Sequence, residues 1–358
     1  MLTPFLHPLA LNLVSVPGVA WLYVGVVLLV ISFLALDLGV FHRNAHVVSM
    51  REAFRWTVVW VSCALLFVIG VYFIYENQWL GVGHDVKQLG GAVRDVAGKE
   101  AAQLFLTGYV IEYSLSMDNV FIIAIIFGYF GTPAVYQHRV LFWGILGALA
   151  MRGAMIFAGA ALITSFSWII YVFGGFLIIT AIKLALSKDE ALDLEKNAVV
   201  RIVRRFLPIS PHYDGQRFFT RLDGKLAATP LFLALAVVEC TDLIFAVDSV
   251  PAIFAVTADP FLVFTSNIFA IMGLRSLYFL LANLIHRFRY LKPALICILL
   301  FVGVKMLLVH TALKIPPGLA LGVVVAILTS AVVASLMHRS GSEELKPRQI
   351  DKPGKTLP

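Results

Sequence analysis

The chain has 358 residues, of which 60% are hydrophobic and only 14% are charged. Its mean hydropathy of +0.90 excludes an ordinary soluble domain and indicates a polytopic membrane protein. The formal net charge of +7 does not indicate nucleic-acid binding, because the charged residues lie mainly between the apolar stretches.

Nine apolar stretches are long enough to cross a bilayer, which takes about 20 residues of helix. They are predicted near 20–41, 56–75, 102–128, 140–163, 167–186, 229–255, 262–285, 293–311 and 317–337. No Lys or Arg precedes the first stretch, so we expect it to remain as a helix and not to be a cleaved signal peptide. The predicted fold is an all-α membrane protein with about nine transmembrane helices.

The distribution of basic residues predicts which way the chain crosses the membrane. Most Lys and Arg residues fall in the connections 42–55, 129–139, 187–228 and 286–292 and in the C-terminal tail. The opposite side has only Lys87, Arg94, Lys99 and Lys314. Because Lys and Arg concentrate on the cytoplasmic side of membrane proteins, we expect the N-terminus outside and the C-terminus in the cytoplasm.

An internal repeat relates two parts of the chain. The strings "EYSLSMDNV", from Glu112, and "DLIFAVDSV", from Asp242, share an acid, five residues, an Asp, then Asn or Ser, then Val. Two bases follow in the same order on the next two predicted helices of each part: Arg152 and Lys183, then Arg275 and Lys305. A repeated unit of three helices is an odd number of crossings, so its second copy is inverted, which is typical of secondary transporters.

The repeat also divides the chain. We predict an N-terminal helix pair with an extracytoplasmic loop over 1–101, a first three-helix repeat over 102–186 and a cytoplasmic connector over 187–228. A second, inverted three-helix repeat follows over 229–311, and the last helix with a cytoplasmic tail over 312–358. The cysteines Cys63, Cys240 and Cys297 all lie within predicted spans, which indicates packing and no disulfide framework.

Carboxylates within predicted spans are costly in hydrocarbon, so they are candidate functional residues. The predicted metal ligands are Glu112, Asp118, Asp242, Asp248 and Glu239, and the supporting residues are Asn119, Ser249, Asp37, Arg152, Arg275, Lys183 and Lys305. Six acids against four bases leave a formal charge of −2, which one divalent cation or two protons would neutralise. Oxygen ligands suit Mn²⁺, Mg²⁺ or Ca²⁺, whereas an oxyanion such as tellurite would need the opposite charge balance.

Several of these residues also have structural interpretations. The two arginines could be props of buried ion pairs, the two lysines could extend their charges to the membrane surface, and Asp37 could cap a helix. Acids six residues apart, such as Asp242 and Asp248, are about 120° apart around a straight helix and cannot share one face. Either each acid faces a different part of the bundle, or the helices are broken, for which Pro251 is the candidate position in the sixth helix.

The segments "EYSLSMDNVFII" and "ECTDLIFAVDSVPAIFAVT", the latter followed by "NIFAIMGLRSLYFLL", resemble the two signature segments of the TerC family of integral membrane proteins. The extra N-terminal pair, with Asp37 in "LALDLGVFHR", resembles the Alx branch of that family. The resemblance implies a LysE-superfamily-like fold and a manganese exporter of a bacterial inner membrane. The family also has an older association with tellurium resistance, so the resemblance leaves two substrate classes open.

The leading hypothesis is a secondary transporter that exports Mn²⁺, with protons as the counter-ion. The alternatives are a Ca²⁺ exporter and a membrane partner protein in tellurium resistance or envelope stress, for which the connector 187–228 would matter more than the acids. We do not expect an enzyme, because the sequence lacks the HExxH, GxSxG and GxGD motifs. The expected partners are the cation and the lipid bilayer, with no nucleic acid and no permanently bound cofactor.

Overall fold

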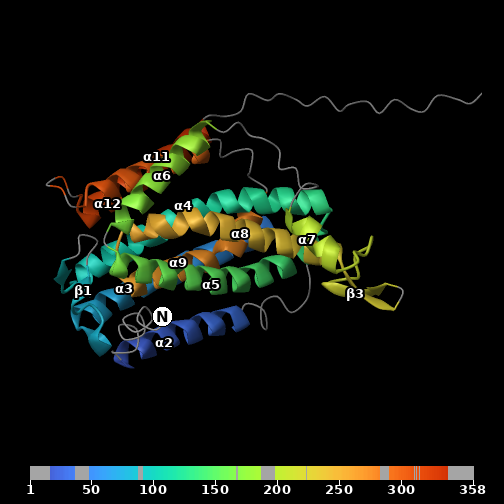
Figure 1. Ribbon diagram of the computed structural model, residues 1–358, viewed down its shortest axis with the longest axis horizontal. Coiled ribbons are helices and arrows are strands. Elements are labelled where there is room, and N and C mark those ends of the chain that lie inside the picture. Colours follow the sequence, from blue (N-terminus) through green and yellow to red (C-terminus); the bar gives the residue numbers. More distant parts are fainter. Residues whose placement is uncertain are drawn as a thin grey trace, which may run out of the picture.

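The structure is a computed structural model that describes residues 17–36, 48–87, 92–166, 168–186, 198–222, 224–282, 290–309, 311, 313 and 315–337. Most of the long helices run along the longest axis of the molecule, with a small antiparallel hairpin at each end (Figure 1). One hairpin pairs β1 (Val86–Lys87) with β2 (Val93–Arg94), and the other pairs β3 (Phe219–Leu222) with β4 (Lys225–Ala228). The predicted all-α membrane fold is confirmed.

The helices carry nearly all of the secondary structure. In chain order they are α2 (Pro17–Leu36), α3 (Met50–Glu76), the short 3-10 helix η2 (Trp79–Gly81), α4 (Gly98–Phe130), α5 (Ala134–Ser165), α6 (Ile169–Leu186), α7 (Ala198–Phe206), α8 (Pro230–Phe254), α9 (Pro260–Met272), α10 (Leu274–Ala282), α11 (Leu291–Leu307) and α12 (Pro317–Met337).

The predicted spans can be compared with these helices one by one. Within the described residues, seven helices are long and apolar enough to cross a membrane, and α9 with α10 makes an eighth span if the pair counts as one. The ninth predicted stretch, 293–311, contains α11, a helix of 17 residues. Every predicted stretch therefore contains a helix, although α11 is shorter than an ordinary span.

The structure has a broken helix, but the break is not at Pro251, the position that the sequence indicated. Helix α8 continues through Pro251 to Phe254, so a broken sixth helix is wrong. The break lies instead between α9 and α10, which are bent by 41° at Gly273. A Cβ atom at Gly273 would lie 3.3 Å from the ring of Tyr113, so the small residue allows α4 to pass close to the bend.

Side-chain caps fix where two of the central helices begin. Thr229 caps α8 by accepting a hydrogen bond from the Phe232 N–H, and Pro230 occupies the first helical position. Asp259 caps α9 by accepting from the Phe261 N–H, and its other oxygen accepts from the Tyr75 hydroxyl at 2.7 Å. Burial raises the pKa of the Asp259 carboxyl, while these hydrogen bonds oppose the shift.

Helix α4 forms the centre of the bundle. It packs against α3, α8, α9 and α12, and α5 packs against α8 (Figure 1). Helices α6 and α11 pack closely because Gly174 and Gly303 face each other, with a Cβ atom at Gly303 only 3.0 Å from the Gly174 carbonyl oxygen. In a two-fold repeat, the first helix of each copy contacts the second helix of the other copy. The contacts of α4 with α9 and of α5 with α8 meet this requirement, although the inverted repeat itself stays a prediction.

Candidate functional site

The centre of the site is the guanidinium group of Arg152, which α5 places between α4 and α8. Arg152 is 2% exposed and forms ion pairs with Glu112 of α4, which is fully buried, and with Asp242 of α8. Its Nη2 and Nε donate to the two oxygens of Asp242 at 2.8 and 3.1 Å, and its Nη1 donates to Ser249 Oγ at 3.2 Å. The Asn119 amide also donates to Asp242 Oδ1, at 3.2 Å.

We call Glu112, Asn119, Asp242 and Ser249 the carboxylate cradle. On each helix the acid and the neutral residue are seven positions apart, which is close to two turns and places both on the same face. Both cradle faces therefore point at Arg152 without any break in α4 or α8. A buried arginine in this position forms ion pairs with two carboxylates that would otherwise be very costly inside the bundle.

Asp248 belongs to a different environment from Asp242. It accepts a hydrogen bond from Thr180 Oγ1 of α6 at 3.2 Å, and Lys183, which is exposed on the last turn of α6, acts on it electrostatically. It lines a cavity of about 80 Å³. The prediction that acids six residues apart face different parts of the bundle is confirmed for Asp242 and Asp248.

This cavity, which we call the Asp248 cavity, adjoins the carboxylate cradle. Its lining residues are Leu115, Asn119, Arg152, Thr180, Leu184, Phe245, Asp248, Ser249, Leu295 and Leu299. Its volume of about 80 Å³ exceeds the roughly 10–15 Å³ of cavity volume that one water molecule needs, and several polar atoms line it. The cavity therefore has room for a partly hydrated ion directly beside Arg152.

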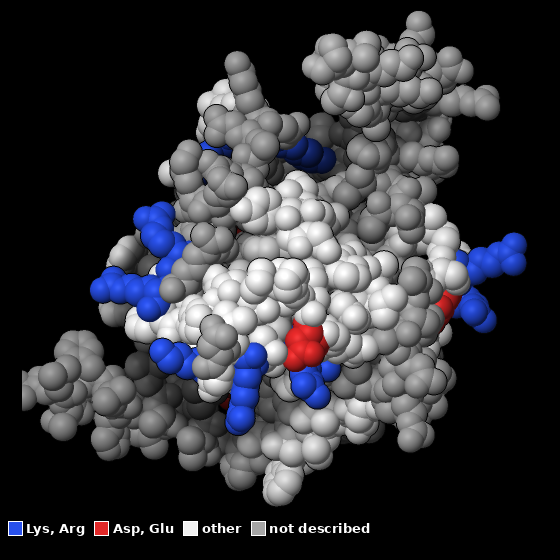
Figure 2. All heavy atoms as spheres, turned by 90° about the vertical axis from the view of Figure 1, so that its right-hand side faces the viewer, with Lys and Arg blue, Asp and Glu red and all other residues white. Residues whose placement is uncertain are grey.

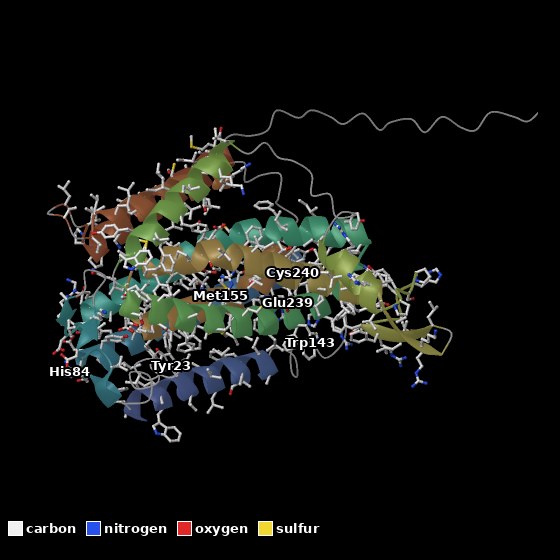
Figure 3. All side chains as sticks on the ribbon, in the orientation of Figure 1. Tyr23, His84, Trp143, Met155, Glu239 and Cys240 are labelled. Atoms are coloured by element: carbon white, nitrogen blue, oxygen red, sulfur yellow. The ribbon has the colours of Figure 1, made fainter. Side chains whose placement is uncertain are left out.

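Glu239 lies one turn before Asp242 on α8, in the middle of the bundle (Figure 3). Its carboxylate packs directly against Gly147 of α5, where any larger residue would overlap it. Glu239 Oε2 is buried and has no hydrogen-bond partner among the described residues. Glu239 is thus close to the cradle along the chain but is held on the neighbouring face between α8 and α5.

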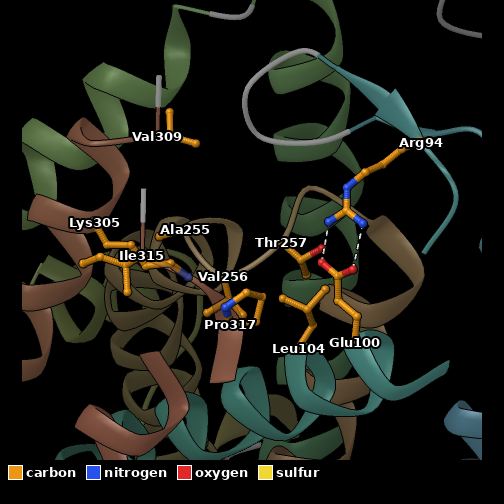
Figure 4. Close-up of a pocket in the computed structure, with 10 residues that line it drawn as sticks. All are labelled: Arg94, Glu100, Leu104, Ala255, Val256, Thr257, Lys305, Val309, Ile315 and Pro317. Carbon is orange, nitrogen blue, oxygen red and sulfur yellow. Dashed lines mark hydrogen bonds and ion pairs between the residues drawn. The ribbon is translucent and has the colours of Figure 1, made fainter. Parts of the chain in front are cut away.

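The remaining predicted bases do not join the cradle. Arg275 is buried at the start of α10, directly after the bend, and Lys305 is 9% exposed in the last turn of α11. Lys305 lines a second cavity, of about 70 Å³, near the β1–β2 hairpin (Figure 4). Arg94 and Glu100 also line this cavity and form a two-bond ion pair at 2.5 and 2.7 Å.

Two predicted acids cannot be placed. Asp37 lies outside the described residues, and Asp118 lies on α4 with its side chain outside the described part of the structure. Their assignment as ligand and supporting residue stays a prediction. The site described by the structure is therefore the cradle around Arg152, the Asp248 cavity and the neighbouring carboxylate of Glu239.

Two buried or half-buried polar residues carry no charge that would distinguish them in the sequence. Thr180 is an ordinary hydroxyl residue in an apolar helix, and Asn267 of α9 is fully buried, so neither has a charge to mark it. Separately, His84, Asp85 and Asp95 form an exposed group near the β1–β2 hairpin whose ligand-type atoms lie within 4.8 Å of one another. Hydrogen bonds within that group, such as His84 Nδ1 to Asp95 Oδ1 at 2.8 Å, already account for its geometry.

Comparison with known proteins gives one family. The family described as "Integral membrane protein TerC family" matches residues 97–343. No solved structure matches the chain.

Individual relatives cover nearly the whole chain. An uncharacterized membrane protein of Myxococcus xanthus is 49% identical over 324 residues, which is 90% of this chain and 93% of that protein. A protein of Escherichia coli strain K12, named as a candidate membrane-bound redox modulator, Alx, is 45% identical over 317 residues, 88% of this chain and 94% of that protein. An uncharacterized membrane protein of Rickettsia bellii is 37% identical, over 87% of this chain and 96% of that protein.

Proposed function

The chain belongs to the TerC family of integral membrane proteins, and on that premise we propose that it is a secondary transporter that exports a divalent cation, most specifically Mn²⁺, from the bacterial cytoplasm. The observation that carries the proposal is the buried carboxylate cradle, in which Arg152 occupies the place of a cation. Intramembrane charges of this kind mark ion pathways more often than scaffolds.

The cradle supplies the ligand types that a hard cation prefers. Two carboxylates and one hydroxyl converge on the Arg152 guanidinium from helices α4 and α8, and the Asn119 amide lies beside them, where it donates to Asp242. Mn²⁺, Mg²⁺ and Ca²⁺ all accept such oxygen ligands, whereas thiolate-seeking ions do not favour them. The choice of Mn²⁺ among the three rests on the family resemblance.

Arg152 allows the transporter to change its orientation when no cation is bound. While its guanidinium pairs with Glu112 and Asp242, it reduces the formal charge of the site from −2 to −1. An arriving cation replaces the guanidinium, and a departing cation lets it return. Glu112, Asp242 and Arg152 together therefore carry a formal charge of −1 without the cation and +1 with a divalent cation, so neither state leaves both carboxylates without a positive partner.

In this mechanism the cation binds first in the Asp248 cavity, before it enters the cradle. Asp248 is half-buried and lines the same cavity as Arg152, so a cation held by Asp248 lies next to the cradle. Electrostatic repulsion between that cation and the guanidinium favours release of Arg152 from the acids. Because carboxylates exchange protons as well as metal ions, protons are the proposed counter-ion.

The distribution of basic residues supports the proposed topology. Figure 2 shows the end of the molecule that carries α7 and the β3–β4 hairpin, where exposed Lys and Arg side chains outnumber acidic ones. The basic residues there include Arg201, Arg205, Arg221 and Lys225. Positive residues concentrate on the cytoplasmic side, so we place this end in the cytoplasm and the β1–β2 hairpin outside, with the N-terminus outside and the C-terminus inside.

The proposal is tested by the manganese content of bacterial cells under a manganese load, measured by elemental mass analysis. Cells with the intact protein should contain less manganese than cells without it, and cells with Asp242→Asn should resemble cells without it. A triple variant with Cys63, Cys240 and Cys297 changed to Ala is the matched control for a redox role, because the intact cysteines form no disulfide. Export that depends on the cysteines and not on Asp242 would contradict the proposal.

A further inference from the structure

Asn267 is a fully buried amide that none of the contacts described above involves. Its side chain is fully buried on α9, and neither its amide oxygen nor its amide nitrogen has a hydrogen-bond partner among the described residues. A buried polar group without a hydrogen-bond partner is destabilising, so such a group calls for a ligand, an ion or a water molecule that satisfies it.

Contacts of neighbouring residues fix the direction of Asn267. Ser266 faces α4, because a Cβ atom at Gly108 would lie 2.8 Å from its Oγ. Phe264 faces α5, because its ring lies 3.6 Å from the corresponding position at Gly153. At about 100° per residue, Asn267 lies between these two directions. Its amide is therefore directed between α4 and α5, the helices that carry Glu112 and Arg152.

The height of Asn267 along the bundle also matches the cradle. Gly108 lies beside Ser266, and Tyr113 lies beside Gly273, so α4 and α9 run in the same direction. Asn267 is therefore about level with the residue after Gly108. Glu112 lies about one turn further along the same face of α4, and its long side chain leans back toward the helix N-terminus.

We propose that Asn267 is a neutral oxygen ligand of the transported cation, used when Arg152 has left Glu112; this inference rests on the proposed function. The two cradle carboxylates already balance a divalent charge, so a further carboxylate would hold the ion too strongly for release. An amide oxygen adds coordination without adding charge, and it suits hard cations. While Arg152 pairs with Glu112 and Asp242, no ion is bound, and the Asn267 amide therefore has no partner.

The test measures Mn²⁺ binding to the purified full-length protein in detergent, from the loss of the paramagnetic resonance signal of free aqueous Mn²⁺. Asn267→Leu should bind Mn²⁺ about tenfold more weakly than the intact protein. Its unfolding temperature should be unchanged or higher, because the substitution removes an orphaned amide. Thr265→Val is the matched control: Thr265 is equally buried on α9, but its hydroxyl is satisfied by the Phe261 carbonyl at 2.7 Å.

Asn267→Leu with intact affinity would overturn the inference while leaving the proposed function standing. If the intact protein itself binds no Mn²⁺, Mg²⁺ or Ca²⁺, both fail together. Asn267→Asp decides the matter if the leucine variant does not fold, because it keeps an oxygen in the same place. Binding equal to or tighter than that of the intact protein supports the inference, and lost binding in this variant overturns it.

Discussion

Asp242 and Asp248 lie six residues apart on one continuous helix, yet they have opposite surroundings. Asp242 is 9% exposed and held by Arg152 and Asn119, whereas Asp248 is half-buried, has one hydrogen bond from Thr180 and lines a cavity. A rotation of about 120° around α8 separates the two environments. The comparison shows that one short acidic motif can supply both a neutralised internal site and an open position beside it.

The two acids should therefore respond differently to substitution. Removing the charge partner of Asp242 leaves buried carboxylates without compensation, which affects stability and transport together. Removing the charge of Asp248 leaves no buried charge unpaired. We therefore expect this change to affect transport and not stability.

The largest effect on stability should come from Arg152→Leu. This change leaves Glu112 and Asp242 as uncompensated buried charges, and loss of one member of a buried ion pair costs about 3–5 kcal/mol. The free energy of unfolding of the purified protein, measured by denaturant titration in detergent, should fall by that amount.

The matched control is the triple variant Arg152→Leu, Glu112→Gln, Asp242→Asn. It removes all three charges, so most of the lost stability should return while export stays absent. If Arg152→Leu alone is as stable as the intact protein, the guanidinium does not compensate the two acids and the comparison fails.

A smaller effect on stability is expected for Asp248→Asn. The amide oxygen can still accept the Thr180 hydrogen bond, so the free energy of unfolding should change by no more than about 1 kcal/mol. Export should nevertheless be lost, because the cavity no longer has a charge that attracts the cation. Measurements of intracellular manganese and of unfolding curves test these two statements. Normal export by a stable Asp248→Asn variant would show that the Asp248 cavity is not part of the ion pathway.

The sequence predicted most of the helices because hydropathy and length are local properties. It did not predict the bend at Gly273, because that position depends on how closely α4 approaches through Tyr113. Pro251 indicated a break that the structure lacks: α8 continues through the proline and ends three residues later, at Phe254.

The candidate site could be predicted only in part. The rare charges identified Glu112, Arg152 and Asp242, and helical geometry predicted that Asp248 would face elsewhere. The pairing of each acid with the neutral residue seven positions later could have been read from the same periodicity. Thr180 could not, because only tertiary packing brings α6 beside the acids. The only sequence signal at Asn267 was its place at the start of the signature string "NIFAIMGLRSLYFLL".

Mn²⁺ flux into or out of lipid vesicles that contain the purified protein, with and without Asp242→Asn, tests most directly whether the cradle around Arg152 carries the ion. We expect flux through the intact protein, loss of that flux in the variant, and an opposite movement of protons in the same vesicles. Equal flux through the intact protein and the variant would show that the cradle around Arg152 does not carry the ion, and absence of flux through both would contradict transport itself.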